Sequence, residues 1–101
     1  MVKLSPAAVQ DLKDIKTYIS DELQNPIAAQ NTVDAIITSY ESLSIFPESG
    51  IPVHKYISIP TDYKFILANN YSIFYRIEQN DVLIIRILYS KRNFINILFD
   101  L

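Results

Sequence analysis

Cations and tyrosines gather in the last third of this chain and are its best candidates for chemistry. The set is Lys64, Tyr71, Tyr75, Arg76, Arg86, Tyr89, Lys91 and Arg92. Lysine and arginine side chains can hold phosphate groups and stabilise negative charge that develops in a reaction. Tyrosine rings can stack on nucleic-acid bases. Taken alone, these residues indicate an anion-binding face.

Structural roles compete with this interpretation for several members of the set. Tyr71 and Tyr75 share their side of an alternating strand with Ile73, which favours packing in the core. Arg86 interrupts an apolar strand and could instead pair with an acid or reach the sheet edge. Lys91 and Arg92 could form an ordinary solvated turn.

Other catalytic signatures are missing from the sequence. The chain has no cysteine, so neither a disulfide nor a thiolate nucleophile is available. It shows no metal-ligand spacing and no glycine-rich phosphate loop. The single histidine, His54, stands in a predicted loop without an acid partner, and we interpret it as a surface residue. We therefore expect no metal and no cofactor.

The bulk properties indicate one domain over residues 1–101. A net charge of −2 and a pI near 5.2 argue against a general nucleic-acid binder. The charge is uneven: residues 1–63 hold four Lys or Arg and eight Asp or Glu, whereas residues 64–101 hold five and three. No apolar run approaches the roughly 20 residues of a membrane span, and no signal peptide is evident. We expect a cytoplasmic protein with no membrane association.

Two start signals predict a helical hairpin. Ser5-Pro6 and Asn25-Pro26 each place a capping side chain before a proline at the first helical position. The predicted apolar face of the first helix is Val9, Leu12, Ile15, Ile19 and Leu23. That of the second helix, over 26–45, is Ala29, Val33, Ile36, Ile37, Tyr40 and Leu43. Pro47 cannot continue this helix, and we expect Gly50, the only glycine, to have a positive φ.

Strand signals occupy the rest of the chain. Predicted strands are Met1–Leu4, Tyr56–Ile59, Tyr63–Ala68, Tyr71–Ile77 and Val82–Tyr89, with turns at Asn69-Asn70 and Gln79–Asp81. Residues Asn93–Leu101 predict a short helix or tail. The fold expected is α+β: an N-terminal strand and an antiparallel helical hairpin packed on a mostly antiparallel, twisted sheet of three to four strands. We expect its other face to be partly open, with Ser72 and Arg76 facing out and Lys64 beside them.

The ordered residues resemble the RelE/ParE toxin superfamily over nearly the whole chain. The resemblance rests on Ser5-Pro6-Ala7-Ala8, Asp11-Leu12, Ile15, Tyr18-Ile19, Leu43, Pro47, Gly50, Tyr63-Lys64, Phe74-Tyr75-Arg76-Ile77, Ile84-Ile85-Arg86-Ile87-Leu88-Tyr89 and Lys91-Arg92. It implies the toxin of a type II toxin–antitoxin, or plasmid stabilisation, module. It also implies a cognate antitoxin that wraps around the toxin in a hetero-oligomer.

The superfamily contains two activities. ParE-like members poison DNA gyrase without being enzymes, whereas RelE-like members cut mRNA in the ribosome. The RelE-like alternative would make Arg92, Lys64 and Tyr89 catalytic. Ser72 and Leu98 depart from it, because they stand where RelE-type members carry an arginine and a tyrosine. The resemblance therefore favours a ParE-like growth inhibitor, and a non-toxic, antitoxin-binding remnant is the second alternative.

Binding residues follow from the same resemblance and from an apolar tail. The residues expected to contact the target are Arg76, Arg86, Lys91 and Arg92. Those expected to bind the antitoxin are Phe94, Leu98 and Phe99, because a small domain cannot bury every apolar residue of its tail.

Overall fold

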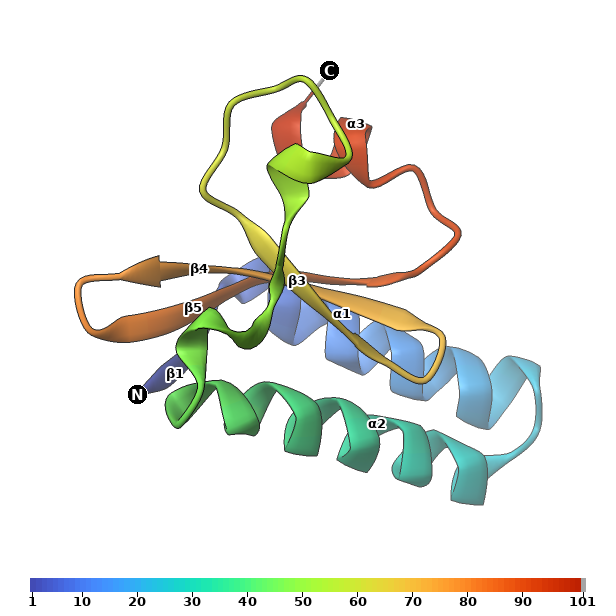
Figure 1. Cartoon of the computed structure of the whole chain (residues 1–101). Helices are drawn as coiled ribbons and strands as arrows, with labels where there is room; N and C mark the ends of the chain where they lie inside the picture. The colour runs from blue at the N-terminus through green and yellow to red at the C-terminus, as the bar shows by residue number, and fades with distance from the viewer. Residues whose placement is uncertain (101) are drawn as a thin grey trace.

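Two long helices cover one face of a five-stranded sheet in this computed structural model, which describes residues 1–100 (Figure 1). The strands are β1 (Val2–Leu4), β2 (Ile51–Pro52), β3 (Lys64–Ala68), β4 (Tyr71–Glu78) and β5 (Asp81–Tyr89). They lie in the order β1-β5-β4-β3-β2, with β1 parallel to β5 and the other neighbours antiparallel. The α+β architecture is confirmed. Besides the N-terminal strand β1, the sheet has four strands, which agrees with the predicted three to four. The strand β2 itself was not predicted, because two residues are too few to show a period.

The predicted start of each long helix is confirmed. The helices are α1 (Pro6–Thr17), α2 (Pro26–Glu41) and the short α3 (Phe94–Phe99). The Ser5 hydroxyl accepts a hydrogen bond from the Ala8 N–H at 3.0 Å, and the Asn25 side chain accepts one from the Ala28 N–H at 3.0 Å. Each cap satisfies a backbone donor that the first helical turn leaves free.

The helix ends differ from the sequence expectation. A single π-helical turn (Tyr18–Glu22) extends α1, and a 3-10 turn (Ser42–Ser44) replaces the last residues predicted for α2. The predicted tail becomes α3, and Leu101 lies outside the described residues. These changes leave the antiparallel hairpin intact.

The main core lies between the hairpin and the sheet. Its buried members are Ala8, Ile15, Ile19, Ala29, Ile36, Tyr40, Leu43, Ala68, Ile73, Tyr75, Val82, Ile84 and Ile87. Two residues predicted for the apolar face of the first helix lie outside this core, because Val9 is 39% and Leu23 is 57% exposed. Asp11, a polar residue, is buried on this face instead.

The second face of the sheet is covered, which corrects the expectation of a partly open face. Phe74 and Leu88 are buried there beneath α3 and the segment 53–65 (Figure 1). Ser72, expected to face solvent, is only 8% exposed. The strand predicted at Tyr56–Ile59 is absent from this covering segment, which bends after a 3-10 turn (Val53–Lys55). Its apolar side chains serve a second core cluster rather than a further strand.

Gly50 has an extended backbone, with φ −72°, so the expectation of a positive φ is wrong. The glycine is required by a close approach instead. The Gly50 N–H donates to the Tyr75 hydroxyl at 2.9 Å, and that hydroxyl donates to the Pro47 carbonyl at 2.7 Å. A Cβ on Gly50 would stand 2.3 Å from the Tyr75 hydroxyl oxygen. The absence of a side chain therefore makes room for a buried ring.

Candidate partner-binding site

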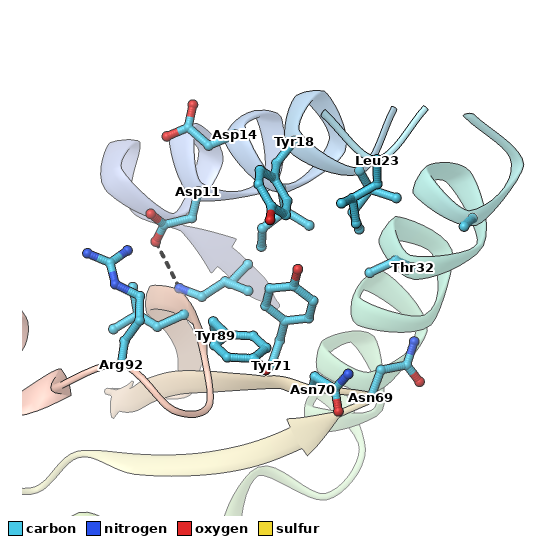
Figure 2. A pocket seen from close by; sticks show the side chains of 15 residues that line it. Asp11, Asp14, Tyr18, Leu23, Thr32, Asn69, Asn70, Tyr71, Tyr89 and Arg92 are labelled. Atoms are coloured by element: carbon cyan, nitrogen blue, oxygen red, sulfur yellow. Dashed lines mark hydrogen bonds between the residues drawn. The ribbon is translucent and has the colours of Figure 1, made fainter. Parts of the chain in front are cut away.

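A groove of about 1010 Å³ opens where the tip of the α1–α2 hairpin faces the ends of β4 and β5 (Figure 2). Four parts of the chain line it: α1 with its π-helical turn, the start of α2, the β3–β4 turn, and the end of β5 with the loop beyond. Its polar lining residues are Asp11, Asp14, Tyr18, Thr32, Asn69, Asn70, Tyr71, Tyr89 and Arg92. The groove thus brings both ends of the sequence to one concave surface.

Tyrosine rings give this groove an aromatic floor. Tyr71 and Tyr89 lie opposite each other on β4 and β5 and meet edge to face, with ring centroids 6.0 Å apart. Burial raises the pKa of Tyr71 above its usual 10.0, and the neighbouring Tyr18 and Tyr89 raise it further. The Tyr71 hydroxyl therefore stays protonated at neutral pH, so it is suited to donating a hydrogen bond rather than to acting as a base.

A basic turn stands at the mouth of the groove. The Arg92 N–H donates to the Tyr89 carbonyl at 2.9 Å, which closes the turn after β5. Lys91 and Arg92 are both exposed, and neither makes an ion pair with another residue of the described range 1–100. The two cations can therefore meet an acidic or phosphate group of a partner without breaking an internal contact.

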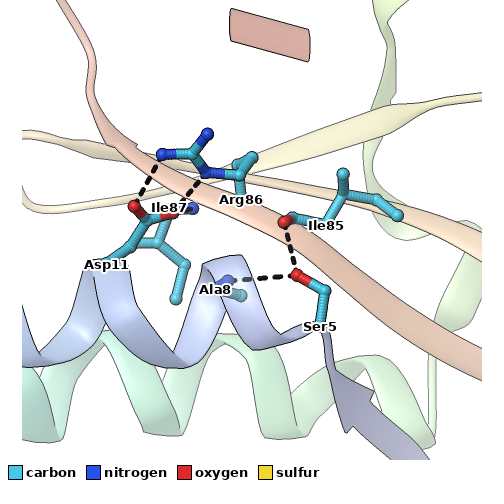
Figure 3. A network of polar contacts seen from close by, with 6 residues as sticks. All are labelled: Ser5, Ala8, Asp11, Ile85, Arg86 and Ile87. Carbon is cyan, nitrogen blue, oxygen red and sulfur yellow. Dashed lines mark hydrogen bonds and ion pairs between the residues drawn. The ribbon is translucent and has the colours of Figure 1, made fainter.

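Arg86 is engaged inside the domain (Figure 3). Its guanidinium donates to both carboxylate oxygens of Asp11, at 2.8 Å each. The Ile87 N–H donates to the same carboxylate at 2.9 Å. The Asp11 side chain is 9% and the Arg86 side chain 26% exposed, and this pairing raises the pKa of Arg86 above its usual value. Arg86, expected at the target surface, thus ties α1 to β5.

A β-bulge lies directly before Arg86 on β5. Phe74 pairs with Arg86 and Tyr75 pairs with Ile84, so Ile85 is an extra residue on β5. The Ser5 hydroxyl donates to the Ile85 carbonyl at 2.7 Å (Figure 3). A bulge redirects the side chains that follow it. The bulged residue Ile85 immediately precedes Arg86, whose side chain points toward the Asp11 carboxylate on α1.

The other predicted site residues divide between separate regions. Lys64 is opposite Tyr75 on β4, four positions along from Tyr71, which faces Tyr89. Four strand positions span roughly 13 Å. Lys64 is also only 19% exposed and contacts Glu48 at 3.4 Å. The structure therefore brings Tyr89 and Arg92 together, whereas it places the third proposed catalytic residue elsewhere.

Arg76 also lies away from the groove. It is on β4, where its guanidinium contacts Asp62 at 3.0 Å and Glu78 at 3.8 Å. Both acids neutralise its charge locally. Of the four cations expected to meet the target, only Lys91 and Arg92 are therefore without an internal acid partner among residues 1–100.

The three apolar residues expected to bind an antitoxin lie on α3. Phe94, Leu98 and Phe99 pack against the second core cluster, and each remains partly exposed. Phe99 stacks on Tyr63 with ring centroids 5.6 Å apart. The tail thus covers the sheet on one side while its other side is available for contact.

Two groups of site residues were not found by sequence reasoning. Asp11 was not among the predicted site residues, because its partner Arg86 is 75 positions away in the sequence. Tyr18 was named only in the family resemblance, and Asn69 and Asn70 were predicted only as a turn. The three-dimensional arrangement places all three in the groove. The available signal for Asp11 was its helical spacing of three and four positions from Ala8 and Ile15, which lie in the core.

Residues 1–100 contain no cluster of acids and histidines suited to a metal ion. No helix in that range is both long enough and apolar enough to cross a membrane.

The aromatic groove and the exposed basic turn give this small α+β domain a surface suited to contact with a partner. The sequence profile described as the ParE toxin of the type II toxin–antitoxin system parDE matches residues 2–94. The chain therefore belongs to the ParE toxin family, whose members are toxins of type II toxin–antitoxin modules. Among curated proteins, no sequence matches it.

A solved structure supports the same fold. The "Chromosomal ParDE TA system from P. aeruginosa" contains a chain that superposes with a TM-score of 0.75 at 20% sequence identity. The superposition covers 89% of this chain and 95% of that chain. The α+β architecture is thus shared at low sequence identity.

Proposed function

We propose that this toxin arrests growth in the cytoplasm by binding and poisoning DNA gyrase. The observation that carries the proposal is the exposed basic turn Lys91-Arg92 beside the tyrosine-lined groove. Exposed cations without internal partners favour contact with an acidic surface or a phosphate. A protonated tyrosine beside them supplies a hydrogen-bond donor and contact area rather than a general base.

The arrangement supports a non-enzymatic poison over an mRNA endonuclease. Lys64 is separated from Tyr89 and Arg92 and contacts Glu48. Ser72, at the position of a RelE-type arginine, is buried and has no positive charge. Ribosome binding would also gain little from a chain with a net charge of −2.

Arg92→Ala should weaken inhibition of gyrase about tenfold, because a charged contact at a protein interface contributes on the order of 1–2 kcal/mol. The measurement is DNA supercoiling by purified gyrase at increasing toxin concentration. Lys13→Ala is the matched control, since Lys13 is an exposed lysine on α1 without an ion pair in residues 1–100.

Full supercoiling at excess toxin would contradict the gyrase proposal, provided the same preparation arrests growth. Cleavage of mRNA on translating ribosomes, lost in Arg92→Ala, would establish the endonuclease alternative instead. If Arg92→Ala and Lys13→Ala weakened the inhibition of gyrase equally, Arg92 would have no specific role in it.

We also propose that a cognate antitoxin neutralises this toxin by covering Phe94, Leu98 and Phe99. The support is the partial exposure of these apolar residues on one short helix. Exposed apolar groups that gather on a small domain are typical of partner surfaces.

Phe99→Glu should weaken antitoxin binding at least tenfold while growth arrest persists, because a charge replaces an apolar contact in the proposed interface. The measurement is growth of cells that express the variant together with the antitoxin that neutralises the unchanged toxin. Asn96→Glu, on the exposed side of the same helix, is the control. Neutralisation of Phe99→Glu as complete as that of the unchanged toxin would contradict this contact.

A further inference from the structure

Four aromatic rings form a row across the second face of the sheet. The ring centroids are 5.9 Å apart for Tyr56 and Phe65, 5.9 Å for Phe65 and Phe74, and 5.2 Å for Phe74 and Phe94. Together with Leu67, the row lines a pocket of about 260 Å³. Small-molecule sites usually occupy about 300–1,000 Å³. The pocket is therefore of a size that suits an apolar side chain of a partner.

The strand beside this pocket has a free edge. β2 pairs only with Lys64 and Phe65 of β3, whereas β4 pairs with all five residues on the other side. The Val53 N–H donates to the Tyr63 carbonyl at 2.9 Å, so Tyr63 presents its backbone groups to the β2 side. In an antiparallel strand, the backbone groups of every second residue point to the same side. Leu67 is four residues after Tyr63, so its N–H and C=O also point to the β2 side, at a position beyond the end of β2.

The free edge is not protected against strand addition. Proteins usually block such an edge with lysine, proline or a bulge, and the segment Ile66–Ala68 contains none of these. The Leu67 residue is 59% exposed, and Tyr56 beside the pocket is 65% exposed. Apolar side chains and unpaired backbone groups therefore coincide at one place.

The charge around the pocket is positive. The two segments that build this surface, 49–77 and 82–99, contain one acidic residue, Asp62, whose charge is paired with Arg76. Lys55 follows the pocket residue Val53 by two positions, and Lys91 follows the pocket residue Ser90. Both lysines are exposed and make no ion pair with another residue in 1–100. The surface therefore complements an acidic partner, although the whole chain carries a charge of −2.

We propose that the free edge of β3 and the aromatic pocket bind an extended acidic segment of a partner protein. The segment adds a strand beside Leu67 and exchanges backbone hydrogen bonds with it. One apolar side chain of the segment enters the pocket. Acidic residues two positions before and after it point to the same face of the strand and meet Lys55 and Lys91. This surface lies outside the tyrosine-lined groove. It shares Lys91 with the basic turn proposed to contact gyrase, and Phe94 with the proposed antitoxin contact.

Two other occupants fit the surface less well. A second copy of this chain, paired edge to edge, would bring two equally basic surfaces together, which like-charge repulsion opposes. Single-stranded nucleic acid needs several exposed rings on which successive bases can stack, whereas only Tyr56 of the four rings is exposed and Phe74 is only 3% exposed. Acidic polypeptide is the occupant that uses the free backbone, the pocket and the charge together.

A labelled synthetic peptide tests the proposal directly on the full chain. The probe is Gly-Ser-Glu-Thr-Leu-Thr-Glu-Ser-Gly, measured by fluorescence anisotropy and by the shifts of backbone amide signals in NMR spectra. We expect binding that weakens as salt is added, with the largest shifts at Leu67 and Ser90. The double variant Lys55→Glu, Lys91→Glu should bind about tenfold more weakly, since two attractive contacts become repulsive.

Three controls separate the parts of this surface. Replacing both glutamates of the peptide by lysine should abolish binding, and N-methylation of the central amides should do the same because it removes backbone donors. Leu67→Pro should bind the peptide at least fivefold more weakly and remain folded, because proline is tolerated where a strand N–H faces outward. Circular dichroism checks that it is folded.

Several results would overturn the proposal. These are no binding at millimolar peptide, equal binding of the acidic and basic peptides, and shifts confined to the groove at Tyr71 and Tyr89. Tighter binding of an oligothymidine than of the peptide would assign the surface to nucleic acid, and a dimer that Leu67→Pro dissolves would assign it to a second copy. None of these outcomes depends on whether gyrase is the target.

Discussion

Replacing Asp11 with alanine is expected to lower the free energy of unfolding by about 3 kcal/mol, because removing one partner of a buried ion pair leaves the other charge uncompensated. The Asp11 carboxylate accepts two hydrogen bonds from Arg86 and a third from the Ile87 N–H. All three donors lose their acceptor in the variant. Urea denaturation followed by circular dichroism measures the change.

The control for Asp11 is Asp14→Ala, one turn further along α1. Asp14 is exposed and bonds only to Gln10, so its loss should change stability by no more than about 0.5 kcal/mol. A double variant, Asp11→Leu with Arg86→Met, should recover part of the loss, since it removes both charges together. Equal destabilisation by Asp11→Ala and Asp14→Ala would show that the buried pair contributes no more than a surface acid.

Gly50→Ala should destabilise the domain by about 2 kcal/mol, within the range for overpacking a filled core. The added Cβ would stand 2.3 Å from the Tyr75 hydroxyl oxygen and 2.7 Å from a carbon of the ring. The ring cannot turn away cheaply, because Tyr75 is fully buried and its hydroxyl bonds to Gly50 and Pro47. Thermal unfolding monitored by circular dichroism measures the effect.

Ser49→Ala is the matched control for Gly50, since Ser49 is exposed and adjacent. Tyr75→Phe removes the oxygen nearest to the new methyl group, so the double variant should lose less stability than the two single variants added together. If the stability losses of Gly50→Ala and Tyr75→Phe simply added in the double variant, the new methyl group and the Tyr75 hydroxyl would not be in contact. A stability of Gly50→Ala equal to that of Ser49→Ala would contradict the close approach altogether.

Local signals accounted for most of the fold. The capping residues Ser5 and Asn25, each followed by proline, placed both helix starts correctly, because a cap depends only on its neighbours in sequence. Alternation in β4 placed Ile73 and Tyr75 on the helix side and Phe74 on the other, as the structure confirms. Such features are decided within a few residues.

Features decided by distant contacts were predicted poorly. The second face of the sheet was expected to be partly open, because the sequence does not show that α3 folds back over Phe74 and Leu88. Gly50 was assigned a positive φ, since nothing near it indicates the ring that approaches from β4. The groove itself was not predicted, and only Tyr71, Tyr89 and Arg92 of its lining were among the candidate residues, because its remaining walls come from the helical hairpin and the β3–β4 turn.

The parallel pairing of β1 with β5 has a consequence for synthesis of the chain. Val2 lies beside Val82, and Ser5 bonds to Ile85 across 80 positions of sequence. Contacts between such distant residues form late and slow the folding of a domain. During translation, β1 and α1 cannot form their contacts with β5 until β5 has been synthesised. Products of interrupted synthesis that stop before β5 lack the basic turn and the strand that pairs with both β1 and β4, so we expect them neither to fold nor to inhibit growth.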